Sequence, residues 1–533
     1  MLSKVYSSGV LGIEGFEVTV ECSAWDRIPA FELVGLPDAA VKEAKNRVRA
    51  ACENSGFVFP ALDVMVNLAP ADVKKEGTAY DLAIITAILQ CDGVIPPDAD
   101  LSDKCFIGEL SLSGEVRAVT GVLSMAVSAR DVGKREIYVP LENAKEAAVV
   151  AGITVYPVST LKQLVEHLRG KEKIEAAPSE LAGIDLSNHS DAPDFSEVCG
   201  QLKAKRALEI AAAGGHNVLM IGPPGTGKSM LAKRLPSILP DMTFEEALET
   251  TKVHSVGGDL RVGLLTDRPF RSPHHTVSPA GFIGGGAHPR PGEISLAHNG
   301  VLFLDELPEF PKSVTEALRQ PLEDGVVTVI RAAAKVKYPA SFMLVCAMNP
   351  CRCGFFGDGT SRCTCSPQMR SKYLDKISGP LLDRIDIEIE LPMVSYDDIS
   401  RKKMTGERSE VIRARVNAAR AFADERLKAA GDEPGLLNAN MSAKMMSTHC
   451  KLGEAAEALM KKRLRESRLL RASTRQGTAR CKNYRGSRRL ARDNRGSRCR
   501  GYYVPRSRKK VLAARSVSTR FGLIPLLKSN KIQ

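Results

Sequence analysis

The first part of the chain alternates between short strand-like stretches and longer helical ones. Period-two alternation and β-branched residues predict strands at residues 16–22, 64–70, 134–140 and 153–158. Apolar residues at helical spacing, or apolar on all sides, predict helices at residues 36–56, 80–90 and 144–152. Residues 1–168 are therefore expected to form one α/β or α+β domain.

Residues 169–192 are polar and have no sustained apolar period, so we interpret them as a linker. A second unit follows in the order helix (198–215), strand (217–222), glycine-rich loop and helix (229–239). We expect an α/β core over residues 193–394, with a parallel sheet and flanking helices, and a helical segment over residues 395–462.

The glycine-rich loop carries the strongest chemical signal. GPPGTGKS fits the pattern G-x-x-x-x-G-K-[ST], and it lies between a strand and a helix as phosphate binding requires. Lys228 would reach the β- and γ-phosphates, and Ser229 would hold Mg²⁺. The predicted nucleotide-binding residues are Gly222, Pro223, Pro224, Gly225, Thr226, Gly227, Lys228 and Ser229.

Two further apolar strands end in polar residues. VLFLDE predicts a buried strand that presents Asp305 as a second Mg²⁺ ligand and Glu306 as the residue that polarises the attacking water. The strand FMLVCAMNP ends in Asn349, which could orient that water or simply cap the next turn. Arg384, in SGPLLDRIDIEIE, could reach the γ-phosphate of a neighbouring subunit in a ring, or form a surface ion pair with Asp383 or Asp386.

Composition excludes several classes of protein. The hydrophobic fraction is 44% and the charged fraction 26%, as in globular proteins. No run of 18 apolar residues and no signal-peptide pattern occurs, so we expect a cytoplasmic protein without a membrane span. The 13 cysteines are irregularly spaced, which argues against a disulfide framework.

The runs quoted so far resemble the Mg-chelatase-like AAA+ ATPases of the YifB/ComM type. Further matching runs are VGLPDAAVKEAKNRVRAA, FIGELSLSGEVRAVTGVL, FRSPHHTVSPAGFIGGG and AMNPCRCGFFGD, and together they cover residues 1 to about 462. The resemblance implies a ribosomal-S5/Lon-like first domain, a P-loop AAA+ core, a helical lid, ATP and Mg²⁺ as cofactors, and a homohexameric ring. It gives Asn349 the sensor-1 role and Arg384 the arginine-finger role.

The ComM branch of this family is associated with ATP-driven branch migration of DNA, so DNA is the expected partner. A chelatase-like remodeller that acts on a protein or metal-insertion partner without DNA is the alternative. The Lon-like fold also raises the possibility of a peptidase. We reject it because the nucleophile position is Ala79 and the lysine position falls near Met125, and a Ser–Lys dyad needs both groups.

Three other features have open interpretations. His274 and His275 could be metal ligands, although adjacent histidines usually point in different directions. Arg331, Lys335 and Lys337 lie in a predicted hairpin and could offer positive charge to DNA phosphates, or be solvated. Four cysteines are spaced C-x-C, nine residues, C-x-C, which suggests a structural Zn²⁺ or else free thiols. They are Cys351, Cys353, Cys363 and Cys365.

The net positive charge of the chain comes entirely from its last 73 residues. Residues 461–533 contain 24 Lys or Arg against two acids, whereas residues 1–460 contain 51 against 60. From residue 463 the sequence no longer matches the family, and we expect a disordered basic tail. A basic DNA-binding arm would explain the charge, but we favour a shift of reading frame near Lys462, because a one-nucleotide shift admits codons for family-like lid helices over about 45 residues. Such a shift would remove the sensor-2 arginine and weaken activity, or leave a gene product with little activity.

Overall fold

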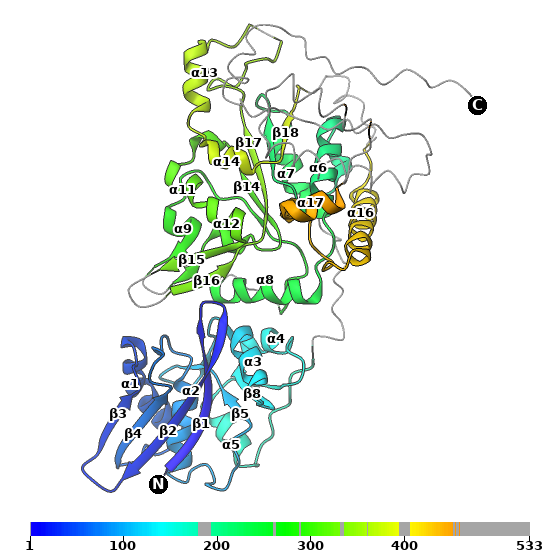
Figure 1. The fold of residues 1–533 in the computed structure, drawn as a ribbon. Coiled ribbons are helices and arrows are strands. Elements are labelled where there is room, and N and C mark those ends of the chain that lie inside the picture. The colour runs from blue at the N-terminus through cyan, green and yellow to red at the C-terminus, as the bar shows by residue number, and fades with distance from the viewer. Residues whose placement is uncertain are drawn as a thin grey trace.

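The structure is a computed structural model that describes residues 2–179, 193–258, 263–286, 289–330, 335–359, 361–393 and 406–450, with Glu454 and Ala458. The predicted basic tail, residues 463–533, lies outside the described residues. Figure 1 shows two bodies joined end to end, an N-terminal domain and a larger C-terminal one.

The N-terminal domain is built on a seven-stranded mixed sheet in the order β3-β4-β2-β1-β5-β8-β9. The seven strands of this sheet are β1 (Leu2–Leu11), β2 (Glu14–Trp25), β3 (Ala30–Val34), β4 (Asp63–Ala69), β5 (Lys104–Phe106), β8 (Glu136–Pro140) and β9 (Thr154–Val158). Two further strands of the domain, β6 (Glu109–Leu110) and β7 (Val116–Arg117), pair with each other. Its helices are α1 (Ala39–Asn54), α2 (Asp81–Cys91), α3 (Val122–Asp131), α4 (Ala144–Ala147) and α5 (Leu161–Leu168).

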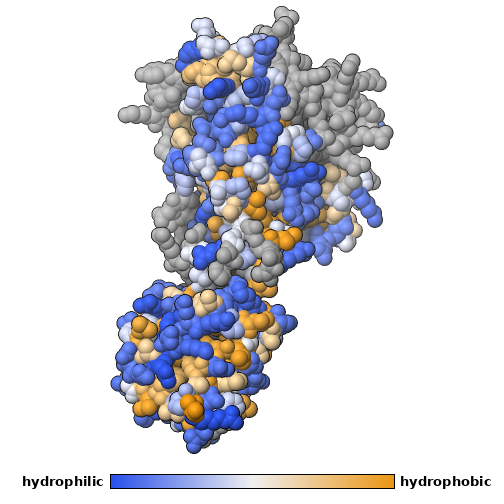
Figure 2. Space-filling model, turned by 90° about the vertical axis from the view of Figure 1, so that its left-hand side faces the viewer, coloured by the Kyte–Doolittle hydropathy of each residue, from blue (hydrophilic) through white to orange (hydrophobic). Residues whose placement is uncertain are grey.

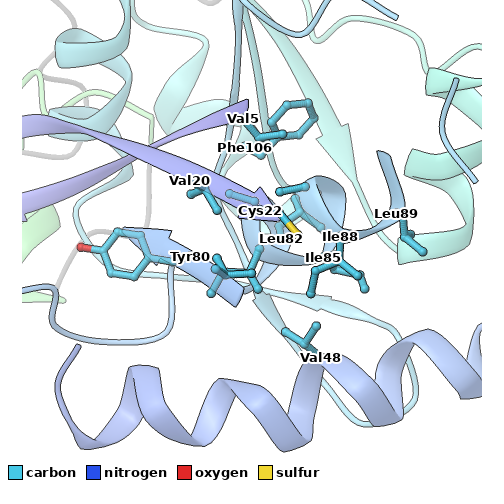
Figure 3. Packing of buried hydrophobic residues seen from close by; sticks show 14 of the residues in the cluster. Val5, Val20, Cys22, Val48, Tyr80, Leu82, Ile85, Ile88, Leu89 and Phe106 are labelled. Carbon is cyan, nitrogen blue, oxygen red and sulfur yellow. The ribbon is translucent and has the colours of Figure 1, made fainter. Parts of the chain in front are cut away.

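Helix α2 is central to this domain because every one of its residues is buried. Figure 3 shows Leu82, Ile85 and Ile88 of α2 among residues of β2 such as Val20, with Val48 of α1 pointing into the same cluster. Such a helix has no polar face, which is why its sequence is apolar on all sides. The core also includes Ile174, and Ala177 N–H donates to Val155 C=O at 2.8 Å. The start of the expected linker therefore packs on this domain.

The C-terminal body contains a five-stranded parallel sheet in the order β11-β14-β17-β10-β18. This confirms the predicted α/β class with a parallel sheet. The sheet strands are β10 (Val218–Ile221), β11 (Phe270–Arg271), β14 (Val301–Leu304), β17 (Met343–Met348) and β18 (Ile387–Glu390). All residues of β10, β14 and β17 are buried, as expected for strands covered on both faces.

Helices and short strands surround this sheet. The helices are α6 (Leu202–Gly214), α7 (Lys228–Arg234), α8 (Phe244–Gly257), α9 (Pro279–Ile283), α10 (Glu293–Leu296), α11 (Lys312–Ala317), α12 (Arg319–Asp324), α13 (Pro367–Leu374), α14 (Gly379–Arg384), α16 (Ser409–Ala429) and α17 (Ala443–His449). The short strands are β12 (Gly284–Gly285), β13 (Arg290–Pro291), β15 (Val326–Ile330) and β16 (Lys335–Pro339), and the 3-10 helices of this body are η3 (Phe195–Glu197), η4 (Leu235–Ile238), η5 (Leu307–Glu309) and η6 (Asn438–Asn440). The N-terminal domain contains the 3-10 helix η1 (Leu141–Asn143).

The two bodies meet through α3 and the β1–β2 turn on one side and α8 on the other. The Ser255 hydroxyl donates to the carboxylate of Glu146, which is buried and also accepts from the Leu123 N–H at 2.9 Å. Ile13, in the β1–β2 turn, belongs to the apolar cluster of the C-terminal body. Figure 2 shows the contact as a narrow waist between two lobes.

Candidate active site

The predicted phosphate loop connects β10 to α7. Gly225 and Gly227 have φ of +79° and +86°, a left-handed conformation that glycine adopts without strain. The Thr226 hydroxyl donates to Pro223 C=O at 2.9 Å, which closes the loop on itself. The backbone N–H groups at the start of α7 are thereby arranged as an anion-binding concavity.

Lys228 lies under this loop. Its Nζ donates to Gly222 C=O at 2.6 Å and to Pro223 C=O at 2.9 Å, and it lies 3.2 Å from Asn349 Oδ1 at the end of β17. Burial lowers the pKa of Lys228, while the nearby charges of Asp305 and Glu306 act in the opposite direction. The structure thus brings the loop lysine and the predicted sensor asparagine together.

The two predicted Mg²⁺ ligands are also in contact. The Ser229 hydroxyl donates to Asp305 Oδ2 at 2.7 Å, and Asp305 directly follows β14. A hydroxyl and a carboxylate oxygen are ligands suited to Mg²⁺, which usually takes one or two protein ligands and keeps phosphate and water oxygens as the rest. The residues therefore fit a Mg²⁺–nucleotide complex in this loop.

Glu306 has an unusual backbone. It is a non-glycine residue with φ of +51°, a conformation that costs about 1–3 kcal/mol and tends to occur at functional sites. Its N–H donates to Asp305 Oδ1 at 2.9 Å, and its carboxylate is 57% exposed. The geometry holds Asp305 inward toward Ser229 and leaves the Glu306 carboxylate open to solvent, as a residue that polarises water requires.

His275 is a neighbour of Glu306 that the sequence did not identify in that position. Its Nδ1 lies 3.7 Å from Glu306 Oε2, and its ring lies 4.0 Å from that of His274. Among the described residues, the one group of three or more His, Cys or acidic side chains with metal-binding geometry is the cysteine group, so the metal interpretation of the two histidines gains no support. The sequence offered one indication of this contact: His275 follows β11 by a few residues, and β11 pairs with β14, the strand that Asp305 and Glu306 follow.

Arg384 lies at the end of α14, where it forms an ion pair with Glu323 of α12. Its side chain is 43% exposed, and it borders a surface cavity lined by Thr315 and Arg319. The ion pair of Arg384 is thus made with Glu323, 61 positions earlier in the chain, and not with Asp383 or Asp386 as one interpretation of the sequence suggested. Within one chain Arg384 is an exposed cation, which is the condition for reaching a neighbouring subunit.

The cysteines come together as the spacing suggested. The Sγ atoms of Cys351, Cys353, Cys363 and Cys365 all lie within 4.8 Å of one another. A hydrogen bond from the Phe355 N–H lowers the pKa of Cys353 to about 6, which favours its thiolate. This group follows Asn349 directly in the chain.

The remaining sequence candidates are placed in part. Lys335 and Lys337 are exposed on β16, two residues apart and therefore on the same face of the β15–β16 hairpin. Arg331 lies outside the described residues. Ala79 and Met125, at the positions of a peptidase dyad, are buried in one apolar cluster.

Three family descriptions match most of the chain. "Magnesium chelatase, subunit ChlI" matches residues 194–399, "Subunit ChlI of Mg-chelatase" matches residues 20–143, and "Magnesium chelatase, subunit ChlI C-terminal" matches residues 406–480. The last match extends past Lys462 to residue 480, so the prediction that the resemblance to the family ends at residue 463 is wrong, while the shift of reading frame stays a prediction. Among curated relatives, competence protein ComM of Haemophilus influenzae is 44% identical over 87% of this chain and 89% of its own length.

The chain belongs to the Mg-chelatase-like AAA+ ATPases of the ComM/YifB group. YifB of Escherichia coli, described as uncharacterized, is 44% identical over 79% of this chain and 81% of its own length. The 67 kDa subunit of magnesium chelatase from Chlorobaculum tepidum is 31% identical, over 29% of this chain and 23% of that protein. Membership of this AAA+ group implies the use of nucleotide and Mg²⁺. None of the helices in the described parts of the chain has the length and apolar character that crossing a membrane requires.

Proposed function

We propose that this chain is an ATP-driven motor that assembles into a homohexameric ring and acts on DNA, in the manner of a branch-migration helicase. The observation that carries the ATPase part is the convergence of Lys228, Asn349 and the Ser229–Asp305 pair at the carboxyl ends of adjacent parallel strands. Phosphoryl transfer depends mainly on positioning and charge, and these residues supply both.

Each residue has a distinct role in this mechanism. Bound Mg²⁺–ATP supplies the phosphoryl group that water attacks. Lys228 would exchange its hydrogen bonds to loop carbonyls for phosphate oxygens, and Ser229 and Asp305 would hold Mg²⁺, which supplies positive charge to the phosphates. Glu306 polarises the attacking water from the solvent side, and Asn349 orients it from β17.

The proposed ring supplies the group that one chain lacks. Arg384 is exposed and paired only through a surface contact with Glu323, within the residues described. In a ring it would leave this partner for the γ-phosphate bound by the neighbouring subunit, where a cation stabilises the charge of the transition state.

Two observations support DNA as the object of the motor. Lys335 and Lys337 present two positive charges on one face of the β15–β16 hairpin, and phosphate contacts of this kind need no particular base sequence. The second is that the relative from Haemophilus influenzae is named a competence protein.

A remodeller that acts without DNA is the second candidate. All three matching family descriptions name a subunit of magnesium chelatase, which is the observation that favours it. The two candidates share the ATPase site and differ in whether DNA changes its turnover.

ATP hydrolysis measured with and without DNA at several salt concentrations separates these candidates. We define the lid-repaired chain as the protein with the reading frame restored near codon 462, and it is tested beside the chain as given. DNA should stimulate hydrolysis, and the affinity for DNA should fall steeply with salt. Lys335→Gln/Lys337→Gln should reduce the logarithmic salt slope by about two, because each lost phosphate contact removes about one. Lys42→Gln/Lys372→Gln removes the same charge from exposed sites elsewhere and should leave the slope unchanged.

Lys228→Ala provides the matched negative control for hydrolysis, with exposed Lys233→Ala of the same helix as its partner. If DNA at low salt has no effect on the lid-repaired chain, the DNA motor is wrong and the remodeller remains. If wild type and Lys228→Ala hydrolyse ATP equally, the ATPase site itself is misassigned.

A further inference from the structure

The four clustered cysteines have the geometry of a tetrahedral metal site. Cys351 Sγ lies 3.3 Å from Cys353 Sγ and 3.8 Å from Cys363 Sγ, and Cys353 Sγ lies 3.7 Å from Cys363 Sγ. Four sulfurs bound to Zn²⁺ at about 2.3 Å stand roughly 3.8 Å apart. The two distances to Cys363 Sγ, 3.8 Å and 3.7 Å, agree with this value. The distance of 3.3 Å is shorter because Cys351 and Cys353 are separated by only one residue.

A disulfide does not describe this group. A disulfide requires sulfurs about 2.05 Å apart, and all four cysteines are free at much longer separations. Cys351 and Cys365 are buried, whereas Cys353 and Cys363 are half-buried. Four converging thiols, partly withdrawn from water and without a bond between them, are the usual surroundings of a structural Zn²⁺.

The protein around the sulfurs is built to hold them. Buried Arg370 of α13 donates to Cys365 C=O at 2.8 Å, and its guanidinium lies 4.1 Å from the centre of the Phe356 ring. These contacts connect both C-x-C pairs to one folded loop.

This loop lies against the nucleotide site. Gly354, with φ of +88°, approaches the phosphate loop so closely that a Cβ there would lie 3.0 Å from Pro224 Cδ and 3.9 Å from Asn349 Cγ. The Tyr373 hydroxyl of α13 accepts a hydrogen bond from the Asn349 N–H. The cysteine loop therefore begins at Asn349, touches the phosphate loop and returns through α13 to Asn349.

We propose that Cys351, Cys353, Cys363 and Cys365 bind one structural Zn²⁺ per chain, and that this site holds Asn349 in register with the phosphate loop. The metal site does not depend on the ATPase proposal. The effect of the metal site on turnover does rest on the ATPase proposal. Asn349 and Pro224 are the points through which the cysteine loop acts on the nucleotide site.

Metal content of the full chain, purified without chelator, tests the site directly. We expect about one Zn²⁺ per chain in the wild type and in Cys199→Ser, an exposed cysteine outside the group. Cys351→Ser/Cys363→Ser should lose the metal. Cys353→Ser/Cys363→Ser changes only half-buried positions, so it tests the ligands even if the first variant does not fold. Co²⁺ added to metal-depleted wild type should give the intense visible absorption of tetrahedral thiolate coordination.

A wild-type chain free of metal, or one that holds iron in place of zinc, would overturn the Zn²⁺ site. Retention of zinc in both double variants would overturn the choice of ligands.

The connection to the nucleotide site is tested on protein whose zinc has been removed. Loss of zinc should reduce turnover by up to about 100-fold, as a displacement near 1 Å can, and adding Zn²⁺ back should restore it. A zinc-free chain with unchanged turnover would overturn the connection and leave the metal site intact. If the ATPase proposal itself fails, the wild type shows no turnover with zinc bound, which is a different outcome.

Discussion

At the scale of single residues, the catalytic assignment depends most on Glu306. Its exposed carboxylate follows Asp305 directly, on a left-handed backbone at the start of η5. Glu306→Gln keeps the shape and the backbone of the residue but removes the charge that polarises water. ATP binding should therefore be retained, and hydrolysis should fall by about 10²–10⁴-fold. Nucleotide binding by fluorescence and phosphate release measure the two effects separately.

The control for this variant is Glu309→Gln. Glu309 lies three residues later and forms an exposed ion pair with Lys376 at 2.8 Å, a contact worth little. The Glu309→Gln variant should therefore hydrolyse ATP at the wild-type rate. Normal turnover in Glu306→Gln would mean that another group polarises the water.

The sequence predicted the residues of this site better than their partners. The loop residues, Asp305 and Asn349 could be located because each follows an apolar strand that the pattern predicts. The pairing of Arg384 with Glu323 and the approach of His275 to Glu306 could not be predicted. Both contacts depend on side chains from elements that the sequence does not place relative to one another.

At the scale of elements, helix α16 is attached to α6 by a charge pair whose carboxylate is buried. Arg415 Nε donates to Glu209 Oε1 at 2.8 Å, and the Glu209 side chain is only 6% exposed. Burial raises the pKa of Glu209, but the hydrogen bonds and charges of Arg415 and Arg206 outweigh it and leave the pKa below its usual value. A carboxylate with a lowered folded pKa stabilises the fold above its unfolded pKa, near 4.3, and this contribution is lost as the pH falls through the folded value.

Arg415→Met should therefore lower the free energy of unfolding by about 1–3 kcal/mol at pH 7, because it removes a charged partner from a buried carboxylate. The difference from wild type should shrink below pH 4, where Glu209 takes up a proton. Denaturant unfolding monitored at both pH values measures this. Glu425→Gln, at an exposed site on the same helix, should change stability by less than about 0.5 kcal/mol at either pH. A difference that is independent of pH would show that Arg415 acts by packing alone.

Elements that are buried along their whole length were predicted more accurately than small elements at the surface, for a physical reason. Helix α2 and strands β10, β14 and β17 are buried along their whole length. Their sequences are therefore mostly apolar, and such runs can be recognised from the sequence alone. The two-residue strands β12 and β13 pair only with each other, and α9 has five residues. Elements of this length are too short to show a repeating apolar pattern in the sequence.

At the scale of the whole molecule, the N-terminal domain is part of the ATPase structure and not an appendage. Ser124 Oγ donates to Ile13 C=O at 2.7 Å, which connects α3 to the β1–β2 turn. Ile13 then packs in the apolar cluster that contains Val253 of α8 and Val336 of the β15–β16 hairpin. The hairpin that we propose to contact DNA is thus in the same cluster as a residue of the N-terminal domain.

The sequence predicted two domains with a linker but not this contact. Ile13 lies in a short turn between two strands, and a single apolar residue in a hairpin turn does not by itself indicate a contact with another domain. Helix α8 has buried polar residues, among them Thr251 and Ser255, which obscure its apolar period. The contact between Ile13 and α8 joins residues about 240 positions apart, so it depends on the fold of both bodies and leaves no local pattern in the sequence.

Ile13→Ala tests whether the N-terminal domain stabilises the ATPase body. Ile13 is 7% exposed, and truncation of a buried isoleucine costs about 2–5 kcal/mol. The affected contacts lie in the other body, so hydrogen exchange should accelerate in α8 and β16, far along the chain from the substitution. Leu11→Ala, at the last residue of β1 and at a side chain that is 49% exposed, is the matched control and should leave exchange in both elements unchanged. If Ile13→Ala accelerates exchange only within β1 and β2, the two bodies are energetically separate, and the turn serves the N-terminal domain alone.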